Sequence, residues 1–241
     1  MTMIVAHRGY SRHYPENTLL AFQKAIEAGC DGIELDVQMT KDGELVVLHD
    51  ETLERTTNGQ GLLQDQVADR VKILNAGKLF PQYGFVPVPL LAQCLELVQS
   101  SGIYAILELK NNVLPYVGME EKVIALVRKY ELTHRIILSS FHGPSLEKCR
   151  LMAPEIPTAL LTRRILFRPG AFARRSGAAY LHVRHTVLTR GQIREVQATG
   201  VKVHVWTVND PRRARMFLRS GVYGIITDDP ENLVALRNAF R

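Results

Sequence analysis

The chain has 241 residues, of which 46% are hydrophobic and 22% charged, a composition that excludes a disordered or fibrous protein. The net charge is +6, and the three cysteines are widely separated without a C-x-x-C pair, which argues against a disulfide framework or a zinc site. No stretch approaches the roughly 20 apolar residues of a membrane span, no signal-peptide pattern is present, and we expect a cytoplasmic protein.

The predicted elements alternate between strand and helix along nearly the whole chain. Apolar runs predict eight strands, at residues 3–7, 32–38, 105–110, 135–140, 158–162, 179–183, 202–207 and 224–227. Apolar residues at helical spacing predict helices at residues 17–28, 90–100, 120–130, 144–151, 169–176, 190–198, 211–220 and 230–239. Strict alternation of strand and helix indicates a parallel sheet, and eight such units favour closure of that sheet into a barrel. We predict an α/β fold, a (β/α)8 TIM barrel forming one domain over residues 1–241. A doubly wound open sheet is the alternative, but its Gly-rich loop is missing after the first strand.

One segment interrupts the alternation. Residues 44–49 are a short extended segment after a Lys41-Asp42-Gly43 turn, and residues from about 50 to 89 show no clean pattern. We predict a small insertion after the second strand. A long irregular segment of this kind is often a lid or subdomain, and a neutral surface insertion is the alternative.

Two predicted strands carry acidic residues on the side that would face into the barrel. Glu34 and Asp36 share one face of the second strand, and Glu108 and Lys110 share one face of the third. Buried carboxylates are costly unless they are paired, hydrogen-bonded or bound to a cation. We predict that Glu34, Asp36 and Glu108 hold one divalent cation, Mg²⁺ or Ca²⁺. An internal salt-bridge network is the alternative, and Lys110 would pair with a carboxylate or hold a substrate phosphate.

Two histidines end extended segments and would lie at the barrel rim. His7 and His49 could exchange protons there near neutral pH, although either one alone is more often structural. Arg8 offers a planar fork suited to phosphate oxygens. Glu16 could hold a catalytic partner in place, and Asn17 could be the N-cap of the first helix.

Trp206 is the only tryptophan, and it shares the predicted inward face of its strand with Lys202 and His204. It is placed to stack on the carbon skeleton of a substrate, and core packing is the alternative. The remaining histidines are expected to be structural or surface residues: His13, His134, His142, His182 and His185.

Basic residues are concentrated between Glu155 and Glu195, where there is no acidic residue. This stretch carries the arginines Arg163, Arg164, Arg168, Arg174, Arg175, Arg184, Arg190 and Arg194. A regional positive field can attract an anionic substrate, a membrane surface or nucleic acid. No nucleic-acid motif accompanies it, so we favour a solvated face or a contact in a homo-oligomer. We expect no nucleic-acid partner and no stable membrane association.

Eight pieces of the chain, in order, resemble the glycerophosphodiester phosphodiesterase family, in its cytoplasmic bacterial type. They are Ala6-His7-Arg8-Gly9, Pro15-Glu16-Asn17-Thr18, Gly32-Ile33-Glu34-Leu35-Asp36-Val37, Val47-Leu48-His49-Asp50, Glu108-Leu109-Lys110, Ser139-Ser140-Phe141, Val205-Trp206-Thr207-Val208-Asn209 and Gly224-Ile225-Ile226-Thr227-Asp228. The resemblance implies a β/α barrel with a small insertion after the second strand. It also implies hydrolysis of glycerophosphodiesters, such as glycerophosphocholine or glycerophosphoethanolamine, to sn-glycerol 3-phosphate and an alcohol.

The resemblance assigns a role to each candidate. Glu34, Asp36 and Glu108 resemble the metal ligands, His7 and His49 the general acid and base, Arg8 and Lys110 the phosphate contacts, and Trp206 the residue packed near the glycerol. A phosphodiester needs neutralised oxygens, a nucleophile and a protonated leaving group. The sequence leaves open which histidine is the acid. It also leaves open whether the nucleophile is water or the glycerol hydroxyl, which would give a cyclic phosphate.

Two rival functions fit parts of the sequence. An enzyme acting on intact lipids would need an apolar entrance, for which Leu166, Phe167 and Phe172 are the candidates. A catalytically inactive barrel that only binds a partner is disfavoured, because every acid, base and ligand position is filled.

Overall fold

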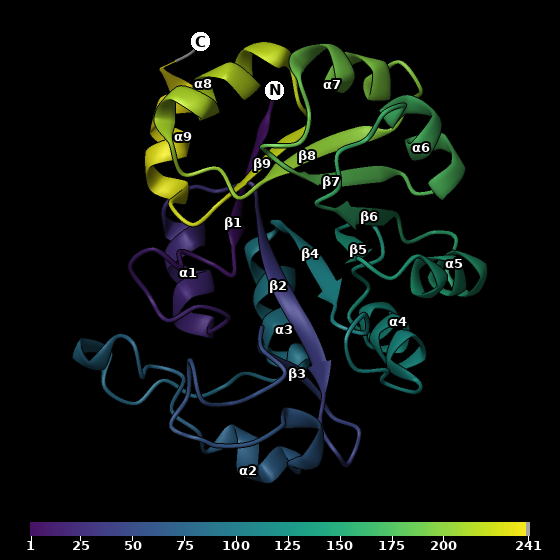
Figure 1. The fold of residues 1–241 in the computed structure, drawn as a ribbon. Helices are drawn as coiled ribbons and strands as arrows, with labels where there is room; N and C mark the ends of the chain where they lie inside the picture. The colour runs from purple at the N-terminus through teal and green to yellow at the C-terminus, as the bar shows by residue number, and fades with distance from the viewer. Residues whose placement is uncertain (240–241) are drawn as a thin grey trace.

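The computed structural model describes residues 1–239; the last two residues of the predicted domain, Phe240 and Arg241, lie outside the described residues. Eight parallel strands close into a barrel, because β1 pairs with both β2 and β9 (Figure 1). The strands are β1 Met3–His7, β2 Gly32–Met39, β4 Tyr104–Leu109, β5 Ile136–Ser140, β6 Thr158–Thr162, β7 Tyr180–Arg184, β8 Lys202–Trp206 and β9 Gly224–Thr227. The predicted TIM barrel is confirmed, and the open-sheet alternative is wrong.

Helices on the outside connect the strands (Figure 1). They are α1 Leu19–Glu27, α3 Leu91–Ser101, α4 Met119–Lys129, α5 Gly143–Met152, α6 Pro169–Ser176, α7 Arg190–Gln197, α8 Pro211–Ser220 and α9 Pro230–Asn238. Each of the eight helices and eight barrel strands begins and ends within two residues of its predicted bounds. Among the described residues, every helix is too short or too polar to cross a membrane.

The short extended segment after the second strand is a ninth strand, β3 Leu45–Val47, which runs antiparallel to the end of β2. The turn between them is held by the hydroxyl of Thr40, which accepts a hydrogen bond from the backbone N–H of Glu44 at 3.0 Å. The backbone N–H of Leu48 then donates to the carbonyl of Asp36 at 3.0 Å. This pairing positions His49, the next residue, beside the C-terminal end of β2.

The predicted insertion leaves the barrel after β3 and returns before α3 (Figure 1, blue). It contains the 3-10 helices η1 Leu63–Asp65 and η2 Pro81–Tyr83 and the short helix α2 Ala68–Lys72. A small apolar cluster holds it together, formed by Val46, Leu48, Leu53, Leu63, Val71, Ala76 and Val88. The backbone N–H of Val47 donates to the carbonyl of Pro89 at 3.0 Å, so the two ends of the insertion meet at β3.

The two faces of the barrel strands differ as the alternation predicted. Ile33, Leu35 and Val37 are fully buried on the outer face of β2, in one cluster with Leu91 and Leu95 of α3. Inside the barrel lies a separate apolar cluster formed by Val5, Ile106, Ile137, Ala159, Tyr180 and Ile226. The interior is therefore filled by side chains below the polar groups at the strand ends.

A pair of buried histidines belongs to this interior. The rings of His182 and His204 lie 4.6 Å apart and are almost fully buried. His204 packs directly against Gly224, where an added Cβ would lie only 2.1 Å from the Cδ2 atom of the ring. Burial lowers the pKa of His204 to about 3 and, with His204 beside it, lowers the pKa of His182 well below its ordinary value. Both rings are therefore neutral in the folded protein at neutral pH.

This pair predicts a specific acid sensitivity of folding. Below about pH 6.5 the unfolded chain binds a proton at each histidine that the folded chain does not bind. The free energy of unfolding should therefore be unaffected by these groups above pH 6.5 and fall as the pH drops toward 4, by up to about 1.4 kcal/mol per pH unit for each group. Urea unfolding of wild type and His204→Gln at several pH values checks this. The variant should show a shallower slope, whatever its absolute stability; equal slopes would contradict the prediction.

Candidate active site

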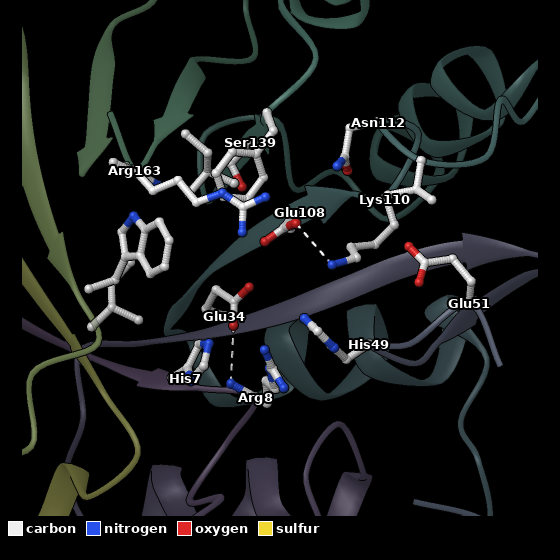
Figure 2. Close-up of a pocket in the computed structure, with 16 residues that line it drawn as sticks. His7, Arg8, Glu34, His49, Glu51, Glu108, Lys110, Asn112, Ser139 and Arg163 are labelled. Atoms are coloured by element: carbon white, nitrogen blue, oxygen red, sulfur yellow. Dashed lines mark hydrogen bonds and ion pairs between the residues drawn. The ribbon is translucent and has the colours of Figure 1, made fainter. Parts of the chain in front are cut away.

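A pocket of about 240 Å³ opens at the C-terminal ends of the barrel strands (Figure 2). The predicted site residues that line it are His7, Arg8, Glu34, His49, Glu108, Lys110 and Trp206. Of the other three, Glu16 contacts Arg8, Asp36 contacts Arg8 and Lys110, and Asn17 donates to Asp36. The structure thus brings all ten predicted residues into one region.

Three buried carboxylates form the centre of this region. Asp36 on β2 is in register with Glu108 on β4, and Glu34 is in register with His7 on β1. The carboxylate oxygens of Glu34, Asp36 and Glu108 lie within 4.8 Å of one another. Glu108 Oε1 is buried and accepts no hydrogen bond from the described residues, and its ion-pair partner Lys110 Nζ lies 3.3 Å away. We call Glu34, Asp36 and Glu108 the acidic triad.

The three carboxyls of the acidic triad have different proton affinities. Burial, followed by repulsion from Asp36, raises the pKa of Glu34 well above its ordinary value and that of Glu108 to about 7. Burial also opposes ionisation of Asp36, but Arg8 and Lys110 outweigh it and lower its pKa. Arg8 Nε lies 3.3 Å from Asp36 Oδ2, and Lys110 Nζ lies 3.6 Å from Asp36 Oδ1.

The acidic triad fits a hard divalent cation. Two cationic side chains face three buried carboxylates, so Glu34 and Glu108 are ionised only at a cost. All donors are carboxylate oxygens, which Mg²⁺ and Ca²⁺ prefer. Lys110 at 3.3 Å is the partner of Glu108 Oε1 in the described residues, and its geometry leaves this buried oxygen poorly satisfied by a salt-bridge network alone. A cation bound by the acidic triad would lower the cost of ionising Glu34 and Glu108 and would give Glu108 Oε1 a further partner.

The segment after β1 adopts two left-handed backbone conformations that serve the acidic triad. With φ at +56°, Arg8 directs its backbone N–H to Glu34 Oε2 at 3.1 Å. Asn17, with φ at +57°, donates from Nδ2 to Asp36 Oδ2 at 2.8 Å. The predicted N-cap role of Asn17 is wrong: Thr18 caps α1, accepting from the backbone N–H of Ala21. An N-cap residue needs extended backbone, which Asn17 does not have.

A chain of ion pairs joins Arg8 to His49. Arg8 donates to Glu16 at 2.9 Å, and Arg55 of the insertion donates to Glu16 at 2.7 Å and to Asp50. Asp50 Oδ1 in turn lies 2.5 Å from His49 Nδ1. Glu16, which we expected to hold a catalytic partner in place, contacts Arg8 and Arg55, and that role stays a prediction. Sequence reasoning missed Arg55 and assigned no role to Asp50, although Asp50 directly follows His49.

Each rim histidine is held by a carboxylate. His7 Nδ1 lies 2.6 Å from Asp228 Oδ1, and Asn209 Nδ2 donates to the other oxygen of Asp228 at 2.6 Å. A carboxylate can only accept, so Nδ1 of each histidine carries the proton and Nε2 is left for proton exchange. Burial, together with Arg8 and other cations, lowers the pKa of His49, which keeps that ring neutral at neutral pH. Asp228 was part of a recognised sequence piece but was not predicted as a partner of His7.

The pocket has further walls that sequence reasoning missed. Phe141 meets Trp206 edge-on at 5.9 Å, and the Arg163 guanidinium lies 5.6 Å from the Phe141 ring centre. Figure 2 shows Arg163 and Glu51 at opposite ends of the pocket. Neither side chain forms an ion pair within the described part of the chain. His182, expected to be structural or at the surface, also lines the pocket, while its ring is buried in the interior.

Comparisons with known proteins agree with this geometry. Residues 7–232 match the Glycerophosphoryl diester phosphodiesterase family. The chain is 41% identical over 236 residues to a glycerophosphodiester phosphodiesterase of Caldanaerobacter subterraneus subsp. tengcongensis, covering 98% of this chain and 97% of the relative. It is 39% identical over 245 residues to a protein of the same name from Bacillus altitudinis, with 100% of both chains covered.

Solved structures share the fold over its whole length. A glycerophosphodiester phosphodiesterase from Agrobacterium tumefaciens superposes with a TM-score of 0.87 at 32% identity, covering 98% of this chain and 100% of that one. A phosphodiesterase from Oleispira antarctica, in complex with the product sn-glycerol-3-phosphate, superposes with a TM-score of 0.88 at 28% identity, covering 99% and 97%. This chain is therefore a β/α-barrel phosphodiesterase. It belongs to the glycerophosphoryl diester phosphodiesterase family.

The excess negative charge of the acidic triad, three carboxylates against two cations, predicts an unusual stability effect. Replacing Glu108 by Gln removes a buried carboxylate whose pKa is raised, so in metal-free buffer at pH 7 the variant should gain about 1 to 3 kcal/mol of unfolding free energy. Added Mg²⁺ or Ca²⁺ should raise the Tm of wild type more than that of Glu108→Gln. Urea unfolding and thermal melts with and without each cation measure both effects.

Glu120 provides a matched control, because it is as buried as Glu108 but accepts hydrogen bonds from Asn111, Ser145 and Lys148. Glu120→Gln should lose stability and keep the full response to the cation. If Glu108→Gln loses as much stability as the control, the acidic triad is a satisfied salt-bridge network and the cation site is refuted.

Proposed function

We propose that this chain uses one divalent cation, Mg²⁺ or Ca²⁺, to hydrolyse glycerophosphodiesters to sn-glycerol 3-phosphate and an alcohol. Deacylated phospholipids such as glycerophosphocholine and glycerophosphoethanolamine are the proposed substrates. The observation that carries the proposal is the convergence in one pocket of the acidic triad, the cations Arg8 and Lys110, and two carboxylate-held histidines. The product bound to the Oleispira antarctica relative supports the proposed product.

The first requirement of the reaction is charge neutralisation at the phosphate. The cation held by the acidic triad would act as a Lewis acid toward the phosphate oxygens. Arg8 and Lys110 line the pocket beside it and would donate to the same oxygens. Glu16 keeps the Arg8 guanidinium in place, and Asn17 fixes the carboxylate of Asp36, so both residues support the site from behind.

The second requirement is proton transfer at both ends of the breaking ester. His7 and His49 lie on opposite sides of Arg8 in Figure 2, which suits one base and one acid acting across the phosphate. Nε2 of one histidine, in its neutral form, would take the proton of the nucleophile. The other histidine, in its doubly protonated form, would give its Nε2 proton to the departing alkoxide and be left neutral. Trp206 would pack against the glycerol carbons. Trapping of a cyclic phosphate by rapid quench would identify the glycerol hydroxyl as the nucleophile instead of water.

We also propose that the chain works in the cytoplasm as one catalytic domain. The three free cysteines are buried and unpaired, which suits a reducing compartment. The insertion would take part in catalysis through Arg55, because this residue joins Glu16 to Asp50.

One prediction of this proposed function concerns metal dependence. Release of glycerol 3-phosphate from glycerophosphocholine should stop in EDTA and return when Mg²⁺ or Ca²⁺ is added. Glu34→Gln should lower kcat/KM at least about 100-fold, because loss of a ligand exceeds the effect of losing a group that only supports one. Glu96→Gln, the same change at an exposed position of α3, should keep wild-type activity.

Two outcomes would count against this assignment. Full activity in EDTA, with intact turnover in Glu34→Gln, would make the acidic triad structural. No activity on any glycerophosphodiester, with the metal bound, would redirect the search to lysophospholipids.

A second prediction concerns the head group. The Glu51 carboxylate lines the pocket without an ion-pair partner among the described residues and lies opposite Arg163 (Figure 2). Trp206 lies on the Arg163 side, because Phe141 contacts both. If the glycerol packs on Trp206, the alcohol arm reaches Glu51, and an ammonium group there is favoured. The ratio of kcat/KM for glycerophosphoethanolamine over glycerophosphoglycerol should fall about 2- to 5-fold in Glu51→Gln, the size expected for a partly exposed ion pair.

The control for this prediction is Asp65→Asn, which makes the same charge change in the insertion away from the pocket. It should leave the ratio unchanged. A ratio that is equal in wild type and Glu51→Gln would show that the ammonium group does not reach Glu51.

A further inference from the structure

The loop between β6 and α6 exposes two large apolar side chains at the mouth end of the barrel. Phe167 is 98% exposed and Ile165 is 76% exposed, whereas Leu166 between them is buried in the core. Of the three residues expected to form an apolar entrance, Phe167 alone is fully exposed to solvent. Leu166 is buried, and Phe172 is partly buried against the same core. The loop follows the C-terminal end of β6, and its first residue, Arg163, lines the active-site pocket.

Exposed arginines lie at the same end of the barrel as these two side chains. They lie at the ends of β6 and β7, in the loop after β6 and at the starts of α7 and α8, all on the barrel end that carries the pocket. We call them the arginine face: Arg163, Arg164, Arg168, Arg184, Arg190, Arg212 and Arg213. None forms an ion pair with a carboxylate within 4.0 Å in the described part of the chain. The only acidic residue in the loops after β6, β7 and β8 is Asp210, which caps α8.

We propose that the arginine face, together with Ile165 and Phe167, docks the protein reversibly on an anionic lipid surface with the pocket mouth turned toward the bilayer. Peripheral binding takes two signals, an apolar group that enters the interface and basic residues that meet anionic head groups. Both are present here within one end of the barrel. An isolated apolar residue needs no explanation, but a nearly fully exposed Phe with Ile two residues away and arginines on both sides does.

Other occupants fit this surface less well. A second copy packed symmetrically on the same face would place unpaired arginines against unpaired arginines, and like charges repel. Nucleic acid would meet the arginines but would leave the aliphatic Ile165 against phosphates. A reversible, salt-sensitive contact also agrees with the expectation of no stable membrane association. The proposal is independent of the proposed reaction, because docking needs no turnover.

Co-sedimentation with lipid vesicles tests the docking. Wild type should bind vesicles of phosphatidylglycerol and phosphatidylcholine in equal parts, release at high salt, and bind pure phosphatidylcholine vesicles weakly or not at all. Phe167→Ser should lower the partition constant about tenfold, the loss expected when a Phe side chain no longer leaves water. Arg164→Gln should lower it about fivefold. Both variants should hydrolyse a water-soluble substrate like wild type.

Matched controls come from the opposite end of the barrel. Leu151 is 81% exposed near the end of α5, and Lys129 is exposed at the end of α4. Leu151→Ser and Lys129→Gln should leave vesicle binding unchanged. The proposal is overturned if wild type does not bind anionic vesicles, if Phe167→Ser binds no more weakly than Leu151→Ser, or if a duplex oligonucleotide binds while vesicles do not.

Discussion

The burial of three carboxylates side by side at the mouth of one barrel is the constraint on which the rest of the site depends. Register between β2 and β4 sets Asp36 next to Glu108, and the strand alternation adds Glu34 to the same cavity. Buried carboxylates this close together are stable only when positive charge or hydrogen-bond donors offset their repulsion and desolvation. Arg8 and Lys110 supply part of it, and even the positive φ values of Arg8 and Asn17 serve to bring one more donor to the carboxylates.

The barrel and the acidic triad were both predictable because each follows from patterns of apolar and polar residues over a few neighbouring positions. An apolar residue at every second position fixes which face of β2 is outside, and it follows that Glu34 and Asp36 point inward. The spacing of apolar residues is weaker evidence for where a helix or strand begins and ends. The helix was expected to start at Asn17, whereas Thr18 caps it, because a pattern of apolar residues does not show which of two adjacent polar side chains is free to turn toward the backbone.

The partners of the catalytic candidates could not be predicted in this way. Asp228 reaches His7 across 221 residues, and Arg55 reaches Glu16 across 39. Such contacts exist only because the barrel closes and the insertion folds back over its rim, and no local pattern carries that information. Arg163 and Glu51 were missed for the related reason that a charged residue in a loop is ordinarily solvated.

The meeting of the two ends of the insertion at β3 has a consequence for how this protein can diverge. Because the hydrogen bond from Val47 to Pro89 closes the segment at its base, the number of residues in between does not affect the spacing of the barrel strands. The segment is thus free to grow or shrink over evolutionary time without opening the barrel. Arg55 is a position inside it that is not free: any version that loses its guanidinium also separates Glu16 from Asp50. The length of the segment can therefore change only while this side chain is retained.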